Sequence, residues 1–425
     1  MDIVILTVLG VALAAELGLA SLVWWLRQGC PWLIVKSDLM PPIDGQGLRR
    51  FVINGWDPFL GWIRKPNTAH DETGRNNSIT RYHIDSNGAR RTPGYEEASP
   101  RVLAYGDSFT FGRQVNDDET WPYFLSKSLG VRVDNRGVGN YGIDQTIQRL
   151  EREYAQHSAP IIVMGVVPET ICRVASIWKH FSEYGNSFGF KPRFTLDDDG
   201  SLRFIPNPVD LPEKFFRIRE LLPWLMENDY FYARKFKLDI LGFPFLWRLW
   251  RTRRRNVPLL TGALADRFSG GGSNAFHRVM ERNIQVTAEL YKDPRSESLL
   301  LALVNRFAEF ARTNGATPVL VMMPQLLDLH HLRTGNHYYA PFLKKAGRIV
   351  KTIDFGTIFT EDAIDSDNYI DDVYGGHLSV QGNKMIADRL TSVLWPILVE
   401  NVLNKQGEEE TSDKMRDSMA SVDCE

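Results

Sequence analysis

The sequence predicts an α/β fold, a three-layer sandwich with a mostly parallel sheet. From Arg101 onward, apolar strand-like runs alternate with helical stretches, and this alternation indicates βαβ units. A hydrophobic fraction of 43% over 425 residues is enough to fill a sizeable core. An apolar N-terminal run and a long lapse in the alternation predict two additions, a membrane helix and a large helical and hairpin insertion.

The apolar run at positions 3–26 is interrupted only by Glu16. It is long enough to cross the hydrocarbon core of a bilayer, about 30 Å thick. It follows Asp2 rather than a basic region and ends in two tryptophans and Arg27, which favours an uncleaved anchor over a signal peptide. A buried core helix is the alternative. We expect residues 1–27 to form a single-pass membrane anchor.

Charges near this run bear on its orientation. Arg27, Lys36, Arg49 and Arg50 follow it, whereas Asp2 precedes it, and the positive-inside rule then favours a cytoplasmic catalytic domain. The bias is modest, and long domains are exported regardless of charge, so the side of the membrane stays open.

The rest of the chain divides by composition. Residues 28–100 are rich in Gly, Asn, Pro and Arg and predict short strands and loops, and residues 101–402 carry the α/β pattern. An insertion at about 170–298 interrupts that pattern. The polar residues 403–425 are expected to be disordered.

The predicted strands and helices of the α/β region follow from runs of apolar residues and their spacing. Strands are expected at Val102 to Tyr105, Val131 to Asn135, Pro160 to Val166, Pro318 to Met323 and Val350 to Asp354. Helices are expected at Trp121 to Ser128, Asp144 to Gln156, Leu299 to Thr313, Pro341 to Ile349 and Gln381 to Val399.

The insertion contains two recognisable segments. Phe190 to Ile205, with an Asp-Gly turn, predicts a hairpin. Leu241 to Arg255 combines aromatic and basic residues, which is typical of a segment that lies on an anionic membrane surface or meets a membrane partner. The same pattern also fits an amphipathic helix that packs on its own domain and leaves a basic end in solvent.

Composition argues against several classes of function. The formal net charge of −2 provides no general field for nucleic acid. Three cysteines without C-x-x-C spacing indicate neither a zinc site nor a disulfide framework. His330 and His331 are adjacent, so on a helix they would point apart, and no Cys or carboxylate cluster accompanies them. We expect no metal, no cofactor and no nucleic-acid partner.

The stretch VLAYGDSFTFG places Ser108 directly after a predicted strand. A serine at a strand-to-helix junction is either a helix cap or a nucleophile. The nucleophile interpretation gains support because the carboxyl edge of a parallel sheet is where open α/β folds bind ligands, and free N–H groups at the start of a helix stabilise negative charge. Near the C-terminus, His377 follows Asp371 and Asp372. Serine, carboxylate and histidine thus occur in a workable order for acyl transfer.

At these residues the sequence resembles the SGNH (GDSL-type) hydrolase family, over roughly 101–166 and 299–399. GDSFTFG is similar to the family's first block, NRGVGNYGIDQ to its second and GHLSVQGN to its last. The resemblance implies a flavodoxin-like fold, Ser108 as nucleophile and His377 as catalytic base. The segment upstream is similar to that of membrane-anchored members found with polysaccharide-modifying systems.

Two departures concern the oxyanion hole. The family's second-block glycine aligns with Asn140, which keeps the backbone N–H, so the N–H groups of Ser108 and Asn140 are the implied donors. The third block has Val167 where the family has an oxyanion-binding Asn. The Asn140 amide and Thr170 are the candidates to replace the missing donor.

A third departure concerns the acid. The family has Asp three residues before the histidine, where this chain has Tyr374. Asp372 is the favoured acid, because the glycines after it allow the loop to fold back, and Asp371 is the alternative.

The resemblance implies a membrane-anchored serine esterase, or an acyltransferase with an acyl-serine intermediate, acting on ester groups such as acetyl groups of a carbohydrate. It also implies a membrane acyltransferase as a partner. The competing hypothesis is a catalytically silent subunit of the same fold that binds glycan or scaffolds a membrane complex. The missing Asn and the displaced Asp favour that hypothesis, whereas Ser108 and His377 oppose it.

Overall fold

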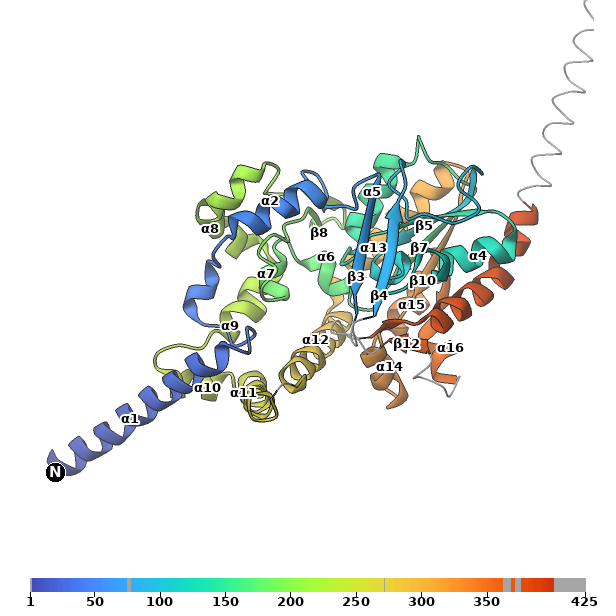
Figure 1. Cartoon of the computed structure of the whole chain (residues 1–425). Coiled ribbons are helices and arrows are strands. Elements are labelled where there is room, and N and C mark those ends of the chain that lie inside the picture. The colour runs from blue at the N-terminus through green and yellow to red at the C-terminus, as the bar shows by residue number, and fades with distance from the viewer. Residues whose placement is uncertain (1, 75–77, 271, 362–367, 371–375, 401–425) are drawn as a thin grey trace, which may run out of the picture. The chain divides into compact units, whose positions relative to one another are not determined.

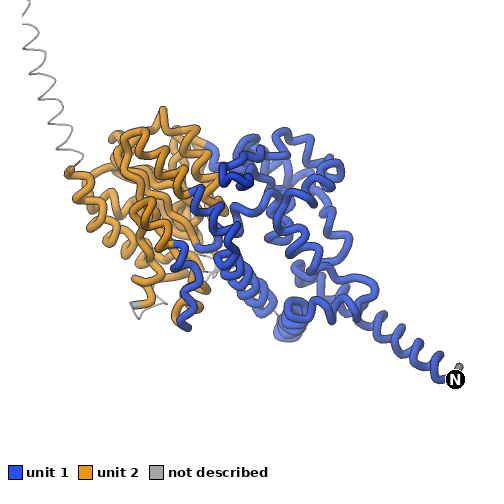
Figure 2. Tube along the Cα trace, turned by 180° about the vertical axis from the view of Figure 1, so that it is seen from behind, with its two compact units in different colours: residues 1–65, 168–303, 334–342 blue, residues 66–167, 304–333, 343–425 orange. Residues whose placement is uncertain are grey.

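The computed structural model describes residues 2–74, 78–270, 272–361, 368–370 and 376–400. The chain divides into two compact units, which Figure 2 shows in different colours. The sheet unit comprises residues 66–167, 304–333 and 343–425, and the insertion unit comprises residues 1–65, 168–303 and 334–342. The segment 403–425, predicted to be disordered, lies outside the described residues.

A five-stranded, all-parallel sheet forms the core of the sheet unit and confirms the predicted α/β class (Figure 1). Its order is β11-β10-β7-β5-β6. Every residue of β6 and β7 is buried, as expected for parallel strands covered on both faces. The strands are β5 (Pro100–Gly106), β6 (Arg132–Gly137), β7 (Ile161–Val166), β10 (Thr317–Met322) and β11 (Lys351–Asp354).

Helices cover the two faces of this sheet. The connections from β5 to β6 and from β6 to β7 run in opposite directions, so right-handed crossovers place α4 (Trp121–Leu129) and α5 (Ile143–Glu153) on opposite faces. Beside α5 lies α13 (Pro294–Thr313), whose Arg306 Nε donates to Glu151 at 2.8 Å. The helix at 380–400 contacts the start of α4, because Asn383 Oδ1 accepts the Trp121 N–H at 2.9 Å. The remaining elements of this unit are β3 (Thr68–Thr73), β4 (Ile79–Ile84), α3 (Ser108–Phe111), α14 (Leu326–Arg333), α16 (Phe355–Glu361), β12 (Tyr369–Ile370) and β13 (His377–Leu378).

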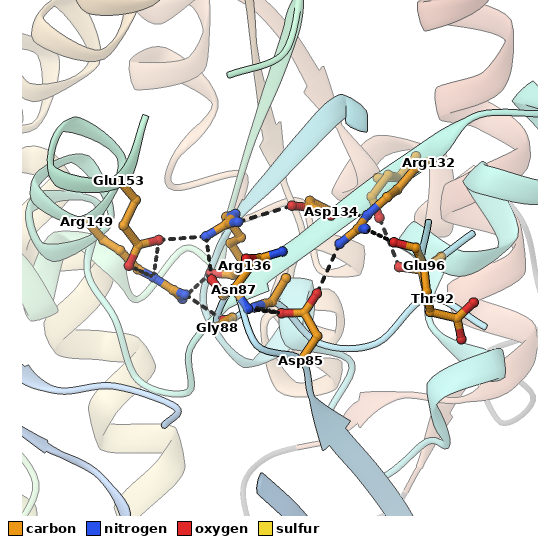
Figure 3. A network of polar contacts seen from close by, with 12 residues as sticks. Asp85, Asn87, Gly88, Thr92, Glu96, Arg132, Asp134, Arg136, Arg149 and Glu153 are labelled. Atoms are coloured by element: carbon orange, nitrogen blue, oxygen red, sulfur yellow. Dashed lines mark hydrogen bonds and ion pairs between the residues drawn. The ribbon is translucent and has the colours of Figure 1, made fainter. Parts of the chain in front are cut away.

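A buried charge network attaches the segment before the sheet to β6 (Figure 3). Asp134 accepts from Arg132 at 2.6 Å and from Arg136 at 3.1 Å. Arg132 also pairs with Asp85 at 3.0 Å, and Arg136 pairs with Glu153 of α5 at 2.9 Å. Because an unpaired buried charge is strongly destabilising, this alternation of charges fixes the loop around Asp85 against the edge strand.

Helices dominate the insertion unit, which also contains the predicted hairpin. Its hairpin strands are β8 (Arg193–Leu196) and β9 (Leu202–Ile205). The longer helices are α1 (Asp2–Arg27), α2 (Gly45–Asn54), α8 (Ile218–Asn228), α11 (Arg253–Phe268) and α12 (Asn274–Lys292). Shorter elements are β1 (Trp56–Asp57), β2 (Gly61–Trp62), α6 (Thr170–Ala175), α7 (Lys179–Ser182), α9 (Lys237–Asp239), α10 (Phe245–Arg251) and α15 (Ala340–Ala346), the last of which extends into the sheet unit.

Among the described helices, α1 is the one long and apolar enough to cross a membrane, over Ile3–Arg27. None of its apolar window is buried in the protein. The last turns are different, because Val23 and Leu26 are buried in a cluster with Leu241 and Leu259. The C-terminal end of α1 therefore belongs to the core of the insertion unit, while its first half is exposed.

Candidate active site

The carboxyl end of β5 lies where the order of the sheet reverses. The chain passes from β5 to β6 on one side and then to β7 on the other side of β5. Open parallel sheets bind their ligands at such a switch point. Ser108, the first residue of α3, stands two positions after β5 and therefore lies at this point.

Asp107, not Ser108, is the cap of α3. Its carboxylate accepts the Phe109 N–H at 2.9 Å and the Val167 N–H at 3.1 Å. The first bond satisfies a free donor at the start of the helix, and the second attaches the turn to the chain that follows β7. The capping role is thus filled by the neighbouring carboxylate, and the Ser108 hydroxyl is available for another contact.

Glycines allow this turn to lie directly against the strand ends. A Cβ atom on Gly137 would stand 2.2 Å from the Phe111 backbone nitrogen. A Cβ atom on Gly165 would stand 2.3 Å from Thr110 Oγ1. Any side chain at either position would push α3 away from β6 or β7, so these glycines fix the height of Ser108 above the sheet.

His377 lies against Ser108. Its Nε2 is 2.9 Å from Ser108 Oγ, and its ring contacts the Phe109 ring with a centroid separation of 5.0 Å. Both residues are buried, with exposed fractions of 5% for His377 and 6% for Ser108. This is the geometry in which a neutral imidazole accepts a hydroxyl proton.

The GHLSVQGN segment holds His377 in this place. Gly376 has φ 87°, and a Cβ atom there would stand 2.6 Å from Leu326 Cβ. Asn383 accepts the Trp121 N–H at 2.9 Å through Oδ1 and donates to the Leu378 carbonyl at 3.3 Å. The motif therefore attaches the histidine strand to the start of α4.

Asn140 lies on the loop after β6 and has φ 66°. This left-handed conformation favours glycine, but asparagine tolerates it better than most residues do. The loop is joined to the end of β5, because the Val138 N–H donates to the Gly106 carbonyl at 3.0 Å. The backbone conformation thus explains how asparagine stands where the family has glycine.

The Val167 side chain is fully buried, and its N–H is bonded to Asp107. Valine has no polar side-chain atom, so position 167 supplies no side-chain donor. Thr170, the other candidate, begins α6 in the insertion unit.

The carboxylates expected to orient His377 fall outside the description of the structure. Asp371 and Asp372, and also Tyr374, are not among the described residues. The choice between the two acids therefore stays a prediction.

Two buried residues that support the serine turn escaped the sequence analysis. Arg90 Nη1 donates to the Phe111 carbonyl at 2.8 Å, and its Nε donates to Asp117 at 2.8 Å. Asn135 Nδ2 donates to the same Phe111 carbonyl at 3.1 Å. Asn135 is the first residue of the second block, so its place in that motif could have indicated a role near the site. Nothing in the spacing of Arg90 indicates that it reaches α3.

Comparisons with known proteins place this geometry in context. No family model and no curated protein matches the chain, whereas 19 chains of solved structures match. One is a protein assigned to the G-D-S-L lipolytic family from Desulfitobacterium hafniense DCB-2, with 14% identity, a TM-score of 0.30 and coverage of 69% of this chain and 98% of that chain. Another is the psychrotrophic esterase EstA from Pseudoalteromonas sp., with 10% identity, a TM-score of 0.31 and coverage of 71% and 98%. The chain is similar to these GDSL-type and esterase structures.

Proposed function

We propose that this chain is a membrane-anchored serine esterase, or an acyltransferase that uses the same acyl-serine intermediate. The observation that carries the proposal is the 2.9 Å separation of His377 Nε2 and Ser108 Oγ at the switch point of a parallel sheet. A buried serine in contact with a buried imidazole is the arrangement that activates a hydroxyl as a nucleophile. The three sequence blocks that resemble SGNH hydrolases support the same conclusion.

In the first step, Ser108 Oγ attacks the ester carbonyl carbon while His377 Nε2 takes the hydroxyl proton. The tetrahedral oxyanion then collapses, the ester C–O bond breaks, and His377 returns the proton to the leaving alcohol. The product is an acyl ester on Ser108. In the second step, His377 deprotonates water or a sugar hydroxyl, which attacks this ester. The bond between the acyl carbon and Ser108 Oγ then breaks, and His377 returns the proton to Ser108.

The oxyanion is proposed to bind the backbone N–H groups of Ser108 and Asn140. Ser108 begins α3, so no residue of that helix accepts its N–H. The loop of Asn140 is bonded to the end of β5, two residues before Ser108. Asp372, or else Asp371, is proposed to hold the imidazole in the tautomer that accepts at Nε2.

For the substrate and location, we propose acetyl or similar ester groups of a carbohydrate, with the chain held in the membrane by α1. The length and hydropathy of α1 support the anchor, and the sequence resemblance supports the substrate class. A membrane acyltransferase as partner rests on that resemblance as well.

Covalent labelling tests the proposal. A fluorophosphonate probe should label the full chain in detergent, and Ser108→Ala should abolish labelling. Hydrolysis of p-nitrophenyl acetate should fall on the order of 10⁶-fold in Ser108→Ala and comparably in His377→Gln. Addition of a glycan acceptor separates the two reactions, because transfer of the acetyl group to the sugar identifies a transferase.

The same assay tests the silent-subunit hypothesis, which the buried, non-donating Val167 side chain favours. The hypothesis would be supported if the folded wild-type chain is neither labelled nor active, and if its Ser108→Ala variant binds glycan as tightly as the wild type does.

Asp372→Asn and Asp371→Asn, compared by kcat, identify the orienting acid. Full activity in both variants would leave neither with that role.

A further inference from the structure

A strongly cationic cavity of about 590 Å³ lies within the insertion unit. It is bordered by α10, by the start of α11, by α12 and by residues 230–239. Eight of its lining side chains are Arg or Lys, and two are carboxylates, Asp239 and Glu289. None of the residues proposed for catalysis lines it.

The two carboxylates are already paired within the cavity wall. Asp239 lies 3.5 Å from Arg255, and Glu289 lies 3.4 Å from Arg282. The remaining cations exceed what these acids neutralise. Within the described part of the chain, Arg248, Arg251 and Arg254 form no ion pair. A cavity with this surplus of guanidinium groups is suited to an anion, and guanidinium pairs bind phosphate oxygens particularly well.

Exposed aromatic residues stand beside this cavity. Trp247 and Trp250 of α10 stack with a centroid separation of 5.0 Å, yet more than half of each side chain is exposed, 53% and 56%. Phe243, just before α10, is 78% exposed. Tryptophan is enriched at the level of lipid headgroups, where one end of the ring is apolar and the other is wet.

Contacts with α1 show where residues 245–255 lie along the length of that helix. Glu16 accepts the N–H groups of Phe245 at 2.6 Å and Leu246 at 3.0 Å, so α10 begins beside the middle of the apolar helix. Ten residues later, Arg255 Nη2 donates to the carbonyl of Trp32, beyond the end of α1. The aromatic start of the segment is therefore level with the apolar part of α1, and its basic end is level with the place where α1 would leave the bilayer.

We propose that this cavity binds the phosphate of an anionic phospholipid headgroup, with α10 running beside α1 from the acyl region toward the headgroups of one leaflet. The position of the cavity at the polar end of α1 selects a lipid over a soluble anion, because the exposed indoles then contact the acyl region of the same leaflet. The inference rests on the anchoring proposed for α1. The position of α10 beside α1 also explains the presence of Glu16 in an apolar helix, because its carboxylate is hydrogen-bonded as the cap of α10.

The test uses the full chain in a nonionic detergent and native mass spectrometry with dioctanoyl phosphatidylglycerol, dioctanoyl phosphatidylcholine and inorganic phosphate. Phosphatidylglycerol should be retained at least tenfold more tightly than phosphatidylcholine, and the triple variant R248Q/R251Q/R254Q should lose most of this preference. The matched control R203Q/R217Q/R219Q removes three exposed charges of the same unit outside the cavity lining and should bind as the wild type does. If the triple variant unfolds, Arg251→Gln alone, at an exposed position, should still weaken binding.

Equal retention of the two lipids, or unchanged binding in a folded R248Q/R251Q/R254Q variant, would overturn the proposal. Inorganic phosphate that displaces the lipid at equal concentration would also overturn it, because a soluble anion is then the ligand. Anchoring is read separately by alkaline extraction of membranes, and catalysis by hydrolysis of p-nitrophenyl acetate, which R248Q/R251Q/R254Q should retain. A chain that fails the extraction test or the hydrolysis assay can therefore still be scored for lipid binding, and the three proposals are tested separately.

Discussion

Asn140 is the residue on which the proposed oxyanion hole depends most. Glycine adopts its φ of 66° without strain, so Asn140→Gly preserves the backbone N–H and the turn. If the side-chain amide replaces the donor missing at position 167, kcat should fall by roughly tenfold or more, as it does on removal of an oxyanion donor. Steady-state kinetics with p-nitrophenyl acetate measure this effect, and thermal unfolding should show little change.

An unchanged or higher kcat in Asn140→Gly would assign the side chain no catalytic part. In that case Val167→Asn should raise activity, since it introduces a side-chain amide donor at that position. The gain has a cost in stability, because Val167 is fully buried and an amide there needs hydrogen-bond partners. Activity and thermal stability should therefore be measured together for this variant.

We expect His180 to make the stability of the insertion unit depend on pH. Burial lowers its pKa from the ordinary value of 6.5, and its neutral ring is satisfied, since Nε2 lies 2.7 Å from the Asp38 carbonyl and Nδ1 accepts the Gly185 N–H at 3.3 Å. Below about pH 6.5 the unfolded chain gains a proton here that the folded chain resists. The free energy of unfolding should therefore be undiminished above that pH and should fall as the pH decreases toward the folded pKa.

Denaturant titrations between about pH 5 and pH 8 measure this slope. His180→Gln should flatten it, whereas His277→Gln, at an exposed position of the same unit, should leave it unchanged. An equal slope in wild type and His180→Gln would show that other groups control the acid sensitivity.

At the scale of elements, α3 is too short to hold its own position and depends on Arg90. The guanidinium donates to the carbonyls of Phe111, Gly112 and Val115 and pairs with Asp117. Replacement by methionine leaves a buried carboxylate and several carbonyls without these donors. We expect Arg90→Met to destabilise the sheet unit by about 3–5 kcal/mol.

Arg91→Met is the matched control, because Arg91 is exposed and pairs with Glu96 at the surface. Loss of such a surface pair should cost less than about 1 kcal/mol. Chemical unfolding of both variants gives the comparison, and similar losses would show that the bonds of Arg90 to the serine turn contribute little. Activity of Arg90→Met under conditions where it remains folded reports whether α3 keeps its place.

At the scale of the whole molecule, α1 combines two roles that deletion separates. Removal of residues 2–15 takes away the exposed residues 3–15 and leaves a helix too short to cross a bilayer, so the chain should be released from membranes with little change in unfolding free energy. Removal of residues 2–27 also deletes the buried Val23 and Leu26, each worth about 1.5–3 kcal/mol. Membrane fractionation and unfolding of the two truncated chains test this separation. If the chain that lacks residues 2–15 stays on membranes, other segments are sufficient for membrane binding.

Local pattern predicted the strands and helices of the sheet because each has its own periodicity. The strand expected at Pro160 to Val166 is β7, and the helix expected at Trp121 to Ser128 is α4 within one residue. The sequence also indicated the pairing of Ser108 with His377 as a hypothesis, from the place of Ser108 after a strand, from the carboxylates that precede His377 and from a family resemblance. It did not indicate that Asp107 caps α3, since a cap and a nucleophile occupy the same kind of junction.

The alternation that makes a parallel sheet, the apolar length of α1 and the residue types of the serine site can be inferred from the sequence alone, because these depend on neighbours along the chain. Tertiary packing brings distant groups together: the 2.9 Å contact of Ser108 and His377 across 269 positions, the reach of Arg90 to α3, and the capping of α10 by Glu16. Such contacts depend on strand order and helix packing, which cannot be inferred directly from the spacing of residues along the chain. The cationic cavity belongs to the same class, because its arginines come from segments that only packing brings together.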